Sequence, residues 1–222
     1  MRIDEIKQNV PSELFARIKR FDSFLPSQEK AIKSGLLEND KNLLICTPTA
    51  SGKTLIAEIA GMKAIFENLG KAIYVAPLKA LAMEKFNQIK ELYGDDLKIG
   101  LSIGDVDSED QKISNFDFIV TTSEKLDSDI RHNPGLLREV KVVIIDEIHL
   151  LHDSSRGPTL EVLITIIKEM VKDIRIIGLS ATIGNAKDLS KWLSAELVLD
   201  TWRPVELRKG IYLDGDIEFF KN

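Results

Sequence analysis

The sequence predicts an α/β fold with a mostly parallel central sheet of about seven strands and helices on both of its faces. Short apolar runs rich in Val, Ile and Leu alternate with longer segments in which apolar residues recur every three or four positions. Polar motifs follow several of these apolar runs. Because open parallel sheets bind ligands at the carboxyl ends of their strands, we expect those motifs to lie together at one edge.

Seven apolar runs are the expected strands, and five segments have a helical pattern. The strands are expected at residues 43–46, 72–76, 98–103, 116–121, 142–146, 175–180 and 197–199, and the helices at residues 12–20, 27–37, 53–68, 78–92 and 159–172. The chain has no internal repeat and no low-complexity tract. This pattern predicts one globular domain.

The most informative motif is TPTASGKT at residues 47–54, between an apolar run and a helical pattern. A loop whose backbone N–H groups converge on phosphates needs small residues, and the helix after it adds the positive end of its dipole. Lys53 can reach the β- and γ-phosphates, and Thr54 can hold Mg²⁺. Thr47 stands where Gly or Ala is usual, which favours a less tightly curled loop. The expected nucleotide-binding residues are Thr47, Pro48, Thr49, Ala50, Ser51, Gly52, Lys53 and Thr54.

A second motif, DEIH, directly follows a β-branched run that is expected to be a buried strand. Asp146 can bind Mg²⁺ through water, and Glu147 can polarise the water that attacks the γ-phosphate. His149 lies one step further along the same loop. The alternative is that the two acids cap a helix and the histidine only packs. We expect Lys53, Asp146, Glu147 and His149 to be the catalytic residues, with Thr54 and Asp146 as the metal ligands.

A third motif consists of Ser180, Ala181 and Thr182 after the expected strand at residues 175–180. These hydroxyls alone could cap a helix. In the order phosphate loop, DEIH and SAT, however, the chain resembles the superfamily 2 DExH helicases in their motifs I, II and III. The resemblance implies a RecA-like P-loop NTPase domain in which the third motif couples nucleotide to nucleic acid.

The resemblance extends to further motifs. FLPSQEKAI at residues 24–32 is similar to the Q motif, in which Gln28 would hydrogen-bond the adenine. APLKALAMEK at 76–85 and VTTSEKLD at 120–127 are similar to motifs Ia and Ib, and IGD at 103–105 matches the element between them. In this family these loops hold one nucleic-acid strand. The matching residues are Pro77, Leu78, Lys79, Gly104, Thr122, Ser123 and Lys125.

Two further segments narrow the resemblance to one branch of the family. HLLHDSSRGPTLE, after DEIH, and DTWRPVEL at residues 200–207 are similar to the Ski-like branch and, within it, to the archaeal Hjm-type DNA repair helicases. The resemblance implies ATP and Mg²⁺ as cofactors, single-stranded or branched DNA as the partner, and 3′ to 5′ movement. An RNA helicase of the same branch and a nucleotide-dependent binding module without translocation are the alternatives.

Helicases of this type need a second RecA-like domain whose arginine contributes about 10³ to 10⁵ in rate. We interpret residues 1–40 as a helical lead-in with the Q motif and residues 41–203 as the RecA-like core. Residues 204–222 are then the connection to the second domain. The isolated chain, as a first motor domain, is expected to be nearly inactive.

Composition and charge bear on the cellular location of the protein and on the way it could bind nucleic acid. The 222 residues are 44% hydrophobic and contain no apolar run near the roughly 18 residues of a membrane span. The N-terminus lacks a secretory signal, and Cys46 is the single cysteine, so we expect a soluble, cytoplasmic protein. The net charge of −5 is the opposite of a basic nucleic-acid footprint. A strand held by backbone amides and hydroxyls, as the resemblance implies, needs little net charge.

Overall fold

The computed structural model describes residues 1–104, 115–206, 208 and 210–220, and a seven-stranded parallel sheet forms its centre. The order across the sheet is β3-β4-β2-β5-β6-β1-β7, and each neighbouring pair runs parallel. The predicted fold class is therefore confirmed. Asp105 and Leu207, which belong to two of the motifs above, lie outside the described residues. The strands are β1 (Asn42–Cys46), β2 (Lys71–Ala76), β3 (Ile99–Ser102), β4 (Phe118–Thr122), β5 (Val140–Ile145), β6 (Arg175–Ser180) and β7 (Ala195–Leu199).

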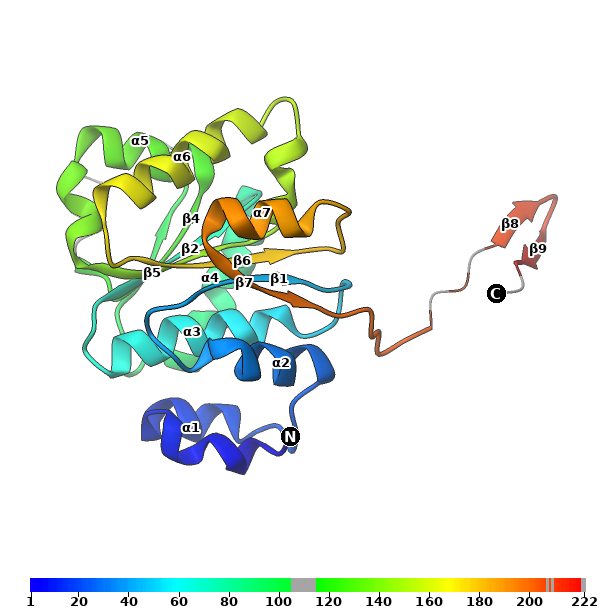
Figure 1. Cartoon of the computed structure of the whole chain (residues 1–222), viewed down its shortest axis with the longest axis horizontal. Helices are drawn as coiled ribbons and strands as arrows, with labels where there is room; N and C mark the ends of the chain where they lie inside the picture. Colours follow the sequence, from blue (N-terminus) through cyan, green and yellow to red (C-terminus); the bar gives the residue numbers. More distant parts are fainter. Residues whose placement is uncertain (105–114, 207, 209, 221–222) are drawn as a thin grey trace.

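Helices cover both faces of this sheet (Figure 1). One face carries α3 (Lys53–Phe66) and α4 (Lys79–Tyr93), and α1 (Ser12–Ile18) and α2 (Pro26–Ala31) pack on α3. The other face carries α5 (Ser123–His132), α6 (Gly157–Met170) and α7 (Ala186–Leu193). Short helical turns complete the layers: η1 (Ile3–Asn9), η2 (Ile32–Leu36), η4 (Pro134–Glu139) and η5 (Ile148–His152). Within the described residues, no helix has both the length and the apolar character to cross a membrane.

Strand side chains alternate between two hydrophobic cores. In β1, Leu43 and Ile45 point to the core under α3, whereas Leu44 and Cys46 point to the core under α6 and α7. Because both faces are covered, the strands are apolar at consecutive positions. This explains why the sequence shows continuous apolar runs and no polar alternation.

Most expected elements agree with the observed ones to within two residues, but the helix expected at 27–37 is wrong in its second half. The α-helix stops at Ala31, and the wider turn η2 follows. Gly35 has a φ of 102°, which a regular helix cannot contain. Two helices, α5 and α7, were not predicted. Each is short, with 10 and 8 residues, and contains few apolar side chains, so a sequence window long enough to recognise a helix also includes the residues around it.

A β-hairpin that was not predicted lies within the expected connection at 204–222. It pairs β8 (Gly210–Leu213) with β9 (Asp216–Phe219) and lies apart from the sheet in Figure 1. Its turn is Asp214 and Gly215, both at positive φ, as two-residue hairpin turns require. The side chains of Tyr212, Ile217 and Phe219 share one face of the ribbon and are mostly exposed.

Arg175, the first residue of β6, ties the sheet to the helical lead-in. Its guanidinium is buried, and it donates from Nε to the Lys41 carbonyl at 2.7 Å. Nη2 donates to the carbonyls of Gly35 and Leu36, each at 2.9 Å. Burial lowers the pKa of this guanidinium to about 10, so it is still charged at neutral pH. These three carbonyls lie at and beyond the end of the helical segment that begins with the Q motif.

We therefore expect Arg175→Met to lower the free energy of unfolding by about 3 kcal/mol or more, because it removes the donors of three carbonyls, two of which are buried. Urea denaturation is the measurement. Arg131→Met is the control, since Arg131 forms an exposed pair with Asp127 within one helix and should change stability little. Equal losses in the two variants would contradict the role given to Arg175.

Candidate functional site

The carboxyl edge of the sheet gathers the predicted motifs in a fixed order. Across the sheet, β4, β2, β5, β6 and β1 are successive neighbours, and each ends in one of the motifs. Two backbone hydrogen bonds join the loops that follow the strands. Thr47 N–H donates to the Ser180 carbonyl at 3.2 Å, and Asp146 N–H donates to the Val75 carbonyl at 2.9 Å. The structure thus brings the phosphate loop, SAT and DEIH side by side.

Hydroxyl groups close the phosphate loop from inside. The Thr47 and Ser51 hydroxyls are 2.7 Å apart, and the Ser27 hydroxyl of α2 donates to the Ser51 carbonyl at 2.6 Å. The β-branched Thr47 is accommodated because its hydroxyl takes part in this closure. Ala50 and Gly52 have φ values of 64° and 83°. A Cβ at position 52 would lie 2.2 Å from the Gln28 amide nitrogen, so this position requires glycine.

Lys53 begins α3 and folds back into the loop. Its ammonium donates to the carbonyls of Thr47 and Pro48 at 3.0 and 3.1 Å. Burial lowers the pKa of Lys53, and the nearby Glu147 and Asp146 carboxylates act in the opposite direction. Anionic phosphate oxygens at a helix N-terminus would be stronger acceptors than these neutral carbonyls. The loop therefore fits a polyphosphate.

The side chains of the loop differ in exposure. Thr49, Ala50 and Thr54 are exposed, whereas Pro48 and Ser51 are buried. Thr54 follows Lys53 in the first turn of α3, so its hydroxyl is accessible to a metal ion.

Gln28 is only 5% exposed, and the protein already uses its amide. Its oxygen accepts from the Leu25 N–H at 2.9 Å, and its nitrogen donates to the Gly52 carbonyl at 3.0 Å. Gln28 therefore connects the start of α2 to the phosphate loop. The adenine contact stays a prediction, and forming it would require the amide to exchange one of these two bonds.

Asp146 and Glu147 follow β5 and face the phosphate loop. The Asp146 carboxylate accepts from the Tyr74 hydroxyl at 2.7 Å and from the Glu147 N–H at 3.0 Å. Glu147 has a φ of 49°, a left-handed conformation that is uncommon for a residue with a side chain. His149 Nδ1 lies 3.1 Å from Glu147 Oε2. Carboxylate and hydroxyl oxygens are the ligands that Mg²⁺ prefers, so Asp146 and Thr54 fit this ion.

The SAT motif lies between the two halves of this site. Ser180 ends β6, the strand between β1 and β5, and is fully buried beside Cys46. Burial raises the pKa of the Cys46 thiol, which keeps it protonated. Ala181 is half-buried and Thr182 is exposed. A shift of β6 would therefore reach both the phosphate loop and DEIH.

Most of the expected nucleic-acid contacts line one hollow of about 470 Å³ beside this site. Ser123 is the exception, because its side chain is buried and lines a smaller neighbouring pocket together with Asp146. Arg156, which was not among the expected contacts, lines both pockets. The larger hollow is lined by Pro77, Leu78, Lys79, Gly104, Thr122, Glu124, Lys125, Ser128 and Arg156.

Two side chains of this site, Tyr74 and Arg156, were not among the expected catalytic, nucleotide-binding or nucleic-acid-binding residues. Tyr74 was assigned only to a buried strand, and the motifs do not include it. Arg156 precedes α6 in the segment SSRGPT. Its position shortly after the DEIH loop is the sequence feature that could have identified it as a site residue.

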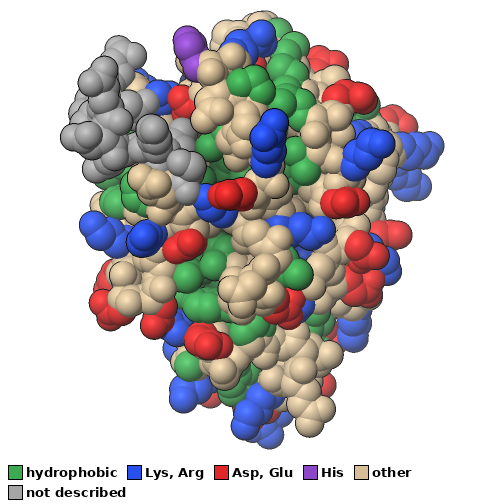
Figure 2. Space-filling model, turned by 90° about the vertical axis from the view of Figure 1, so that its left-hand side faces the viewer, with side chains coloured by type: hydrophobic (Ala, Val, Ile, Leu, Met, Phe, Trp, Pro, Cys, Tyr) green, Lys and Arg blue, Asp and Glu red, His purple; other side chains and the backbone are tan. Residues whose placement is uncertain are grey.

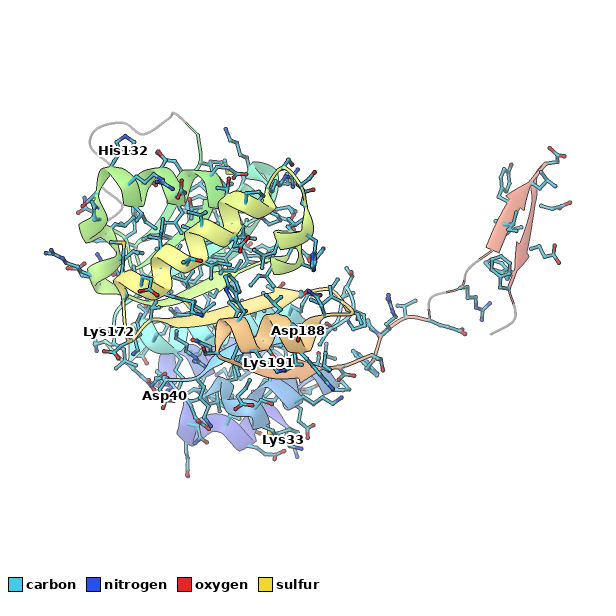
Figure 3. All side chains as sticks on the ribbon, turned by 45° about the horizontal axis from the view of Figure 1, so that its top comes forward. Lys33, Asp40, His132, Lys172, Asp188 and Lys191 are labelled. Atoms are coloured by element: carbon cyan, nitrogen blue, oxygen red, sulfur yellow. The ribbon has the colours of Figure 1, made fainter. Side chains whose placement is uncertain are left out.

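Single-stranded oligonucleotide should bind weakly, with a Kd of about 0.1 mM or weaker, because the net charge is −5. When oligonucleotide is added, the backbone chemical shifts of residues 77–79, 104 and 122–125 should change. The control surface is a hollow of about 840 Å³ at the opposite edge of the sheet, where the strands begin. This hollow likewise has basic side chains in its lining, namely Arg138, Lys141 and Lys172. Figure 3 labels Lys172 there, and Figure 2 shows charges of both signs interspersed on that side. Shifts confined to the control surface would refute the assignment.

The phosphate loop and the acidic pair on a parallel sheet define a P-loop nucleotide-binding domain. The model of one family, the DEAD/DEAH box helicase, matches residues 25–189. The chain belongs to this family.

Curated relatives agree with the family assignment. The chain is 52% identical over 202 residues to the ATP-dependent DNA helicase Hel308 of Methanocaldococcus jannaschii. This alignment covers 87% of this chain and 16% of that protein. It is 46% identical over 215 residues to Hel308 of Pyrococcus abyssi, covering 97% of this chain and 30% of the relative. The chain thus spans less than a third of the length of these relatives.

A solved structure supports the same fold. The DUF1998 helicase MrfA, bound to DNA and AMPPNP, matches with a TM-score of 0.75 and 25% sequence identity. The match covers 87% of this chain and 30% of that one. The RecA-like fold expected from the motifs is therefore confirmed.

Proposed function

We propose that this chain is the ATP-binding N-terminal motor domain of an ATP-dependent 3′ to 5′ DNA helicase that acts in repair or recombination. The observation that carries the proposal is the half-buried Lys53 ammonium, which donates to loop carbonyls and lies near the Asp146 and Glu147 carboxylates. The names of the relatives favour DNA over RNA, since each reported Hel308 is a DNA helicase.

Each motif residue has a role in the proposal. Lys53 and the loop amides hold the β- and γ-phosphates, and Gln28 reads the adenine. Thr54 and Asp146 hold Mg²⁺, which supplies charge neutralisation at the phosphates when it is bound. Glu147 orients the attacking water and accepts its proton, and His149 supports Glu147 from 3.1 Å away. Ser180, Ala181 and Thr182 couple these groups to the strand-binding loops.

The proposal includes a second RecA-like domain of the longer protein. Residues 1–40 are the lead-in, 41–203 the core, and 204–222 the connection to that domain. Single-stranded or branched DNA would lie across residues 77–79, Gly104 and 122–125, and the second domain would supply the arginine for phosphoryl transfer. We place the protein in the cytoplasm, which a single buried thiol supports.

A binding module that uses nucleotide without translocation is the second candidate. The retained Glu147 disfavours it, because a module released from hydrolysis has no need of a group that orients water.

Lys53→Ala should weaken the binding of Mg²⁺-ATP more than tenfold, about 1.4 kcal/mol, because it removes the cation that faces the phosphates. Isothermal calorimetry on the 222-residue chain measures this affinity directly. Lys187→Ala on the exposed surface of α7 is the control and should leave binding unchanged. Unchanged affinity in Lys53→Ala would overturn the assignment of the phosphate loop.

The isolated chain should bind ATP and hydrolyse it barely above background, with or without DNA, because the required arginine lies on another domain. In the longer protein, DNA should stimulate hydrolysis, and Glu147→Gln should keep ATP binding while removing most turnover. A phosphate-release assay measures both. If this chain alone hydrolyses ATP at about a few per second, in the range of complete phosphoryl-transfer enzymes, it carries its own arginine. Arg156 and Arg203 would then be the residues to replace.

A further inference from the structure

Tyr74 is a buried tyrosine whose hydroxyl donates a hydrogen bond to Asp146, the proposed metal ligand. It lies in β2, is 2% exposed, and donates to Asp146 Oδ2 at 2.7 Å. Burial raises the pKa of this phenol well above its usual value, with a further contribution from Asp146. Tyr74 therefore remains a neutral donor at physiological pH.

This hydrogen bond completes the anchoring of the Asp146 carboxylate. Oδ1 accepts from the Glu147 N–H, and Oδ2 accepts from Tyr74. Each carboxylate oxygen can accept two hydrogen bonds, so one acceptor position stays open on each. The carboxylate is thus held in one orientation from both sides and can still accept from metal-bound water.

The Tyr74 ring is also held in place. It belongs to the apolar core under α3 and α4. The Lys85 ammonium of α4 lies 5.6 Å from the ring centroid, within cation–π range. Lys85 also donates to Gln88 Oε1 at 2.9 Å, and burial lowers the pKa of Lys85 while Asp146 and Glu84 oppose that shift. Core packing and this cation thus both contact the ring while its hydroxyl reaches Asp146.

We propose that Tyr74 is a positioning residue that orients the Asp146 carboxylate for the metal ion of the metal–nucleotide complex without touching the nucleotide. The proposal rests on the proposed function, because Asp146 receives a metal ion only when nucleotide binds. Groups that orient metal ligands in this way are typically worth about 10- to 100-fold in metal affinity.

The test is the affinity for ADP in Mg²⁺ and in EDTA, measured by calorimetry on the whole chain. In the unsubstituted chain, Mg²⁺ should increase the affinity for ADP. Tyr74→Phe should make this increase about tenfold smaller. The affinity in EDTA should stay unchanged, because the phosphate loop is intact. Tyr93→Phe is the matched control, since Tyr93 is fully buried and donates to the Glu58 carboxylate at 2.6 Å, away from Asp146. It should change neither affinity.

The outcomes separate this proposal from the proposed function. An undiminished Mg²⁺ gain in Tyr74→Phe overturns the positioning role, and so does an equal loss in Mg²⁺ and EDTA. Absence of ADP binding by the unsubstituted chain overturns the proposed function itself. In an Asp146→Asn background, Tyr74→Phe should have no further effect on the Mg²⁺ gain, because Tyr74 acts through Asp146.

A second measurement needs no substitution at position 74. The chain has three tyrosines, Tyr74, Tyr93 and Tyr212, so 3-fluorotyrosine labelling gives three fluorine resonances. The Tyr93→Phe and Tyr212→Phe variants assign two of them, and the third is Tyr74. The Tyr74 resonance should shift when Mg²⁺ is added to the ADP complex, while the other two stay in place. A Tyr74 resonance insensitive to Mg²⁺ overturns the proposal even if Tyr74→Phe does not fold.

Discussion

The parallel order of the sheet is the constraint on which the rest of the site depends. Since all seven strands run the same way, their carboxyl ends meet at one edge. Motifs separated by more than a hundred residues, such as Thr47 and Ser180, become hydrogen-bonded neighbours there. The strand order β4-β2-β5-β6-β1 also separates these motifs into two groups. The candidate nucleic-acid-binding loops follow β4 and β2, and the nucleotide motifs follow β5, β6 and β1. The boundary between these two groups of motifs therefore lies between β2 and β5.

Contact between Tyr74 and Asp146 joins these two halves. Tyr74 lies three residues before Pro77 of the first strand-binding loop, and Asp146 belongs to the nucleotide half. The helical lead-in supports the nucleotide half from the other side, because Ser27 and Gln28 donate to carbonyls of the phosphate loop. Arg175, at the start of β6, holds the end of this lead-in through the Gly35 and Leu36 carbonyls. The site is held by buried hydrogen bonds on both sides, which is how a scaffold keeps reacting groups in a fixed geometry.

The proposed nucleic-acid binding is compatible with a net charge of −5 because of the same geometry. The hollow that gathers Lys79, Lys125 and Arg156 also contains Glu124 and the Lys125–Asp129 ion pair. Its cations are thus partly neutralised, and the sequence-independent electrostatic attraction to phosphate is small. Backbone N–H groups at the start of α5, after Thr122, add donors for phosphate without adding charge.

The fold class could be predicted from the sequence alone, because continuous apolar strands and amphipathic helices are local patterns. The phosphate loop, DEIH and SAT could also be located in this way. The sequence patterns missed α5 and α7, because each helix is short and largely polar. They also extended one helix past Gly35, whose positive φ only the folded chain reveals. Three contacts became known only from the folded chain: Gln28 donates to the Gly52 carbonyl, Arg175 to the Gly35 carbonyl, and Tyr74 to the Asp146 carboxylate. These contacts join residues 24 to 140 positions apart. Their partners are set by strand order, and no local spacing in the sequence records that order.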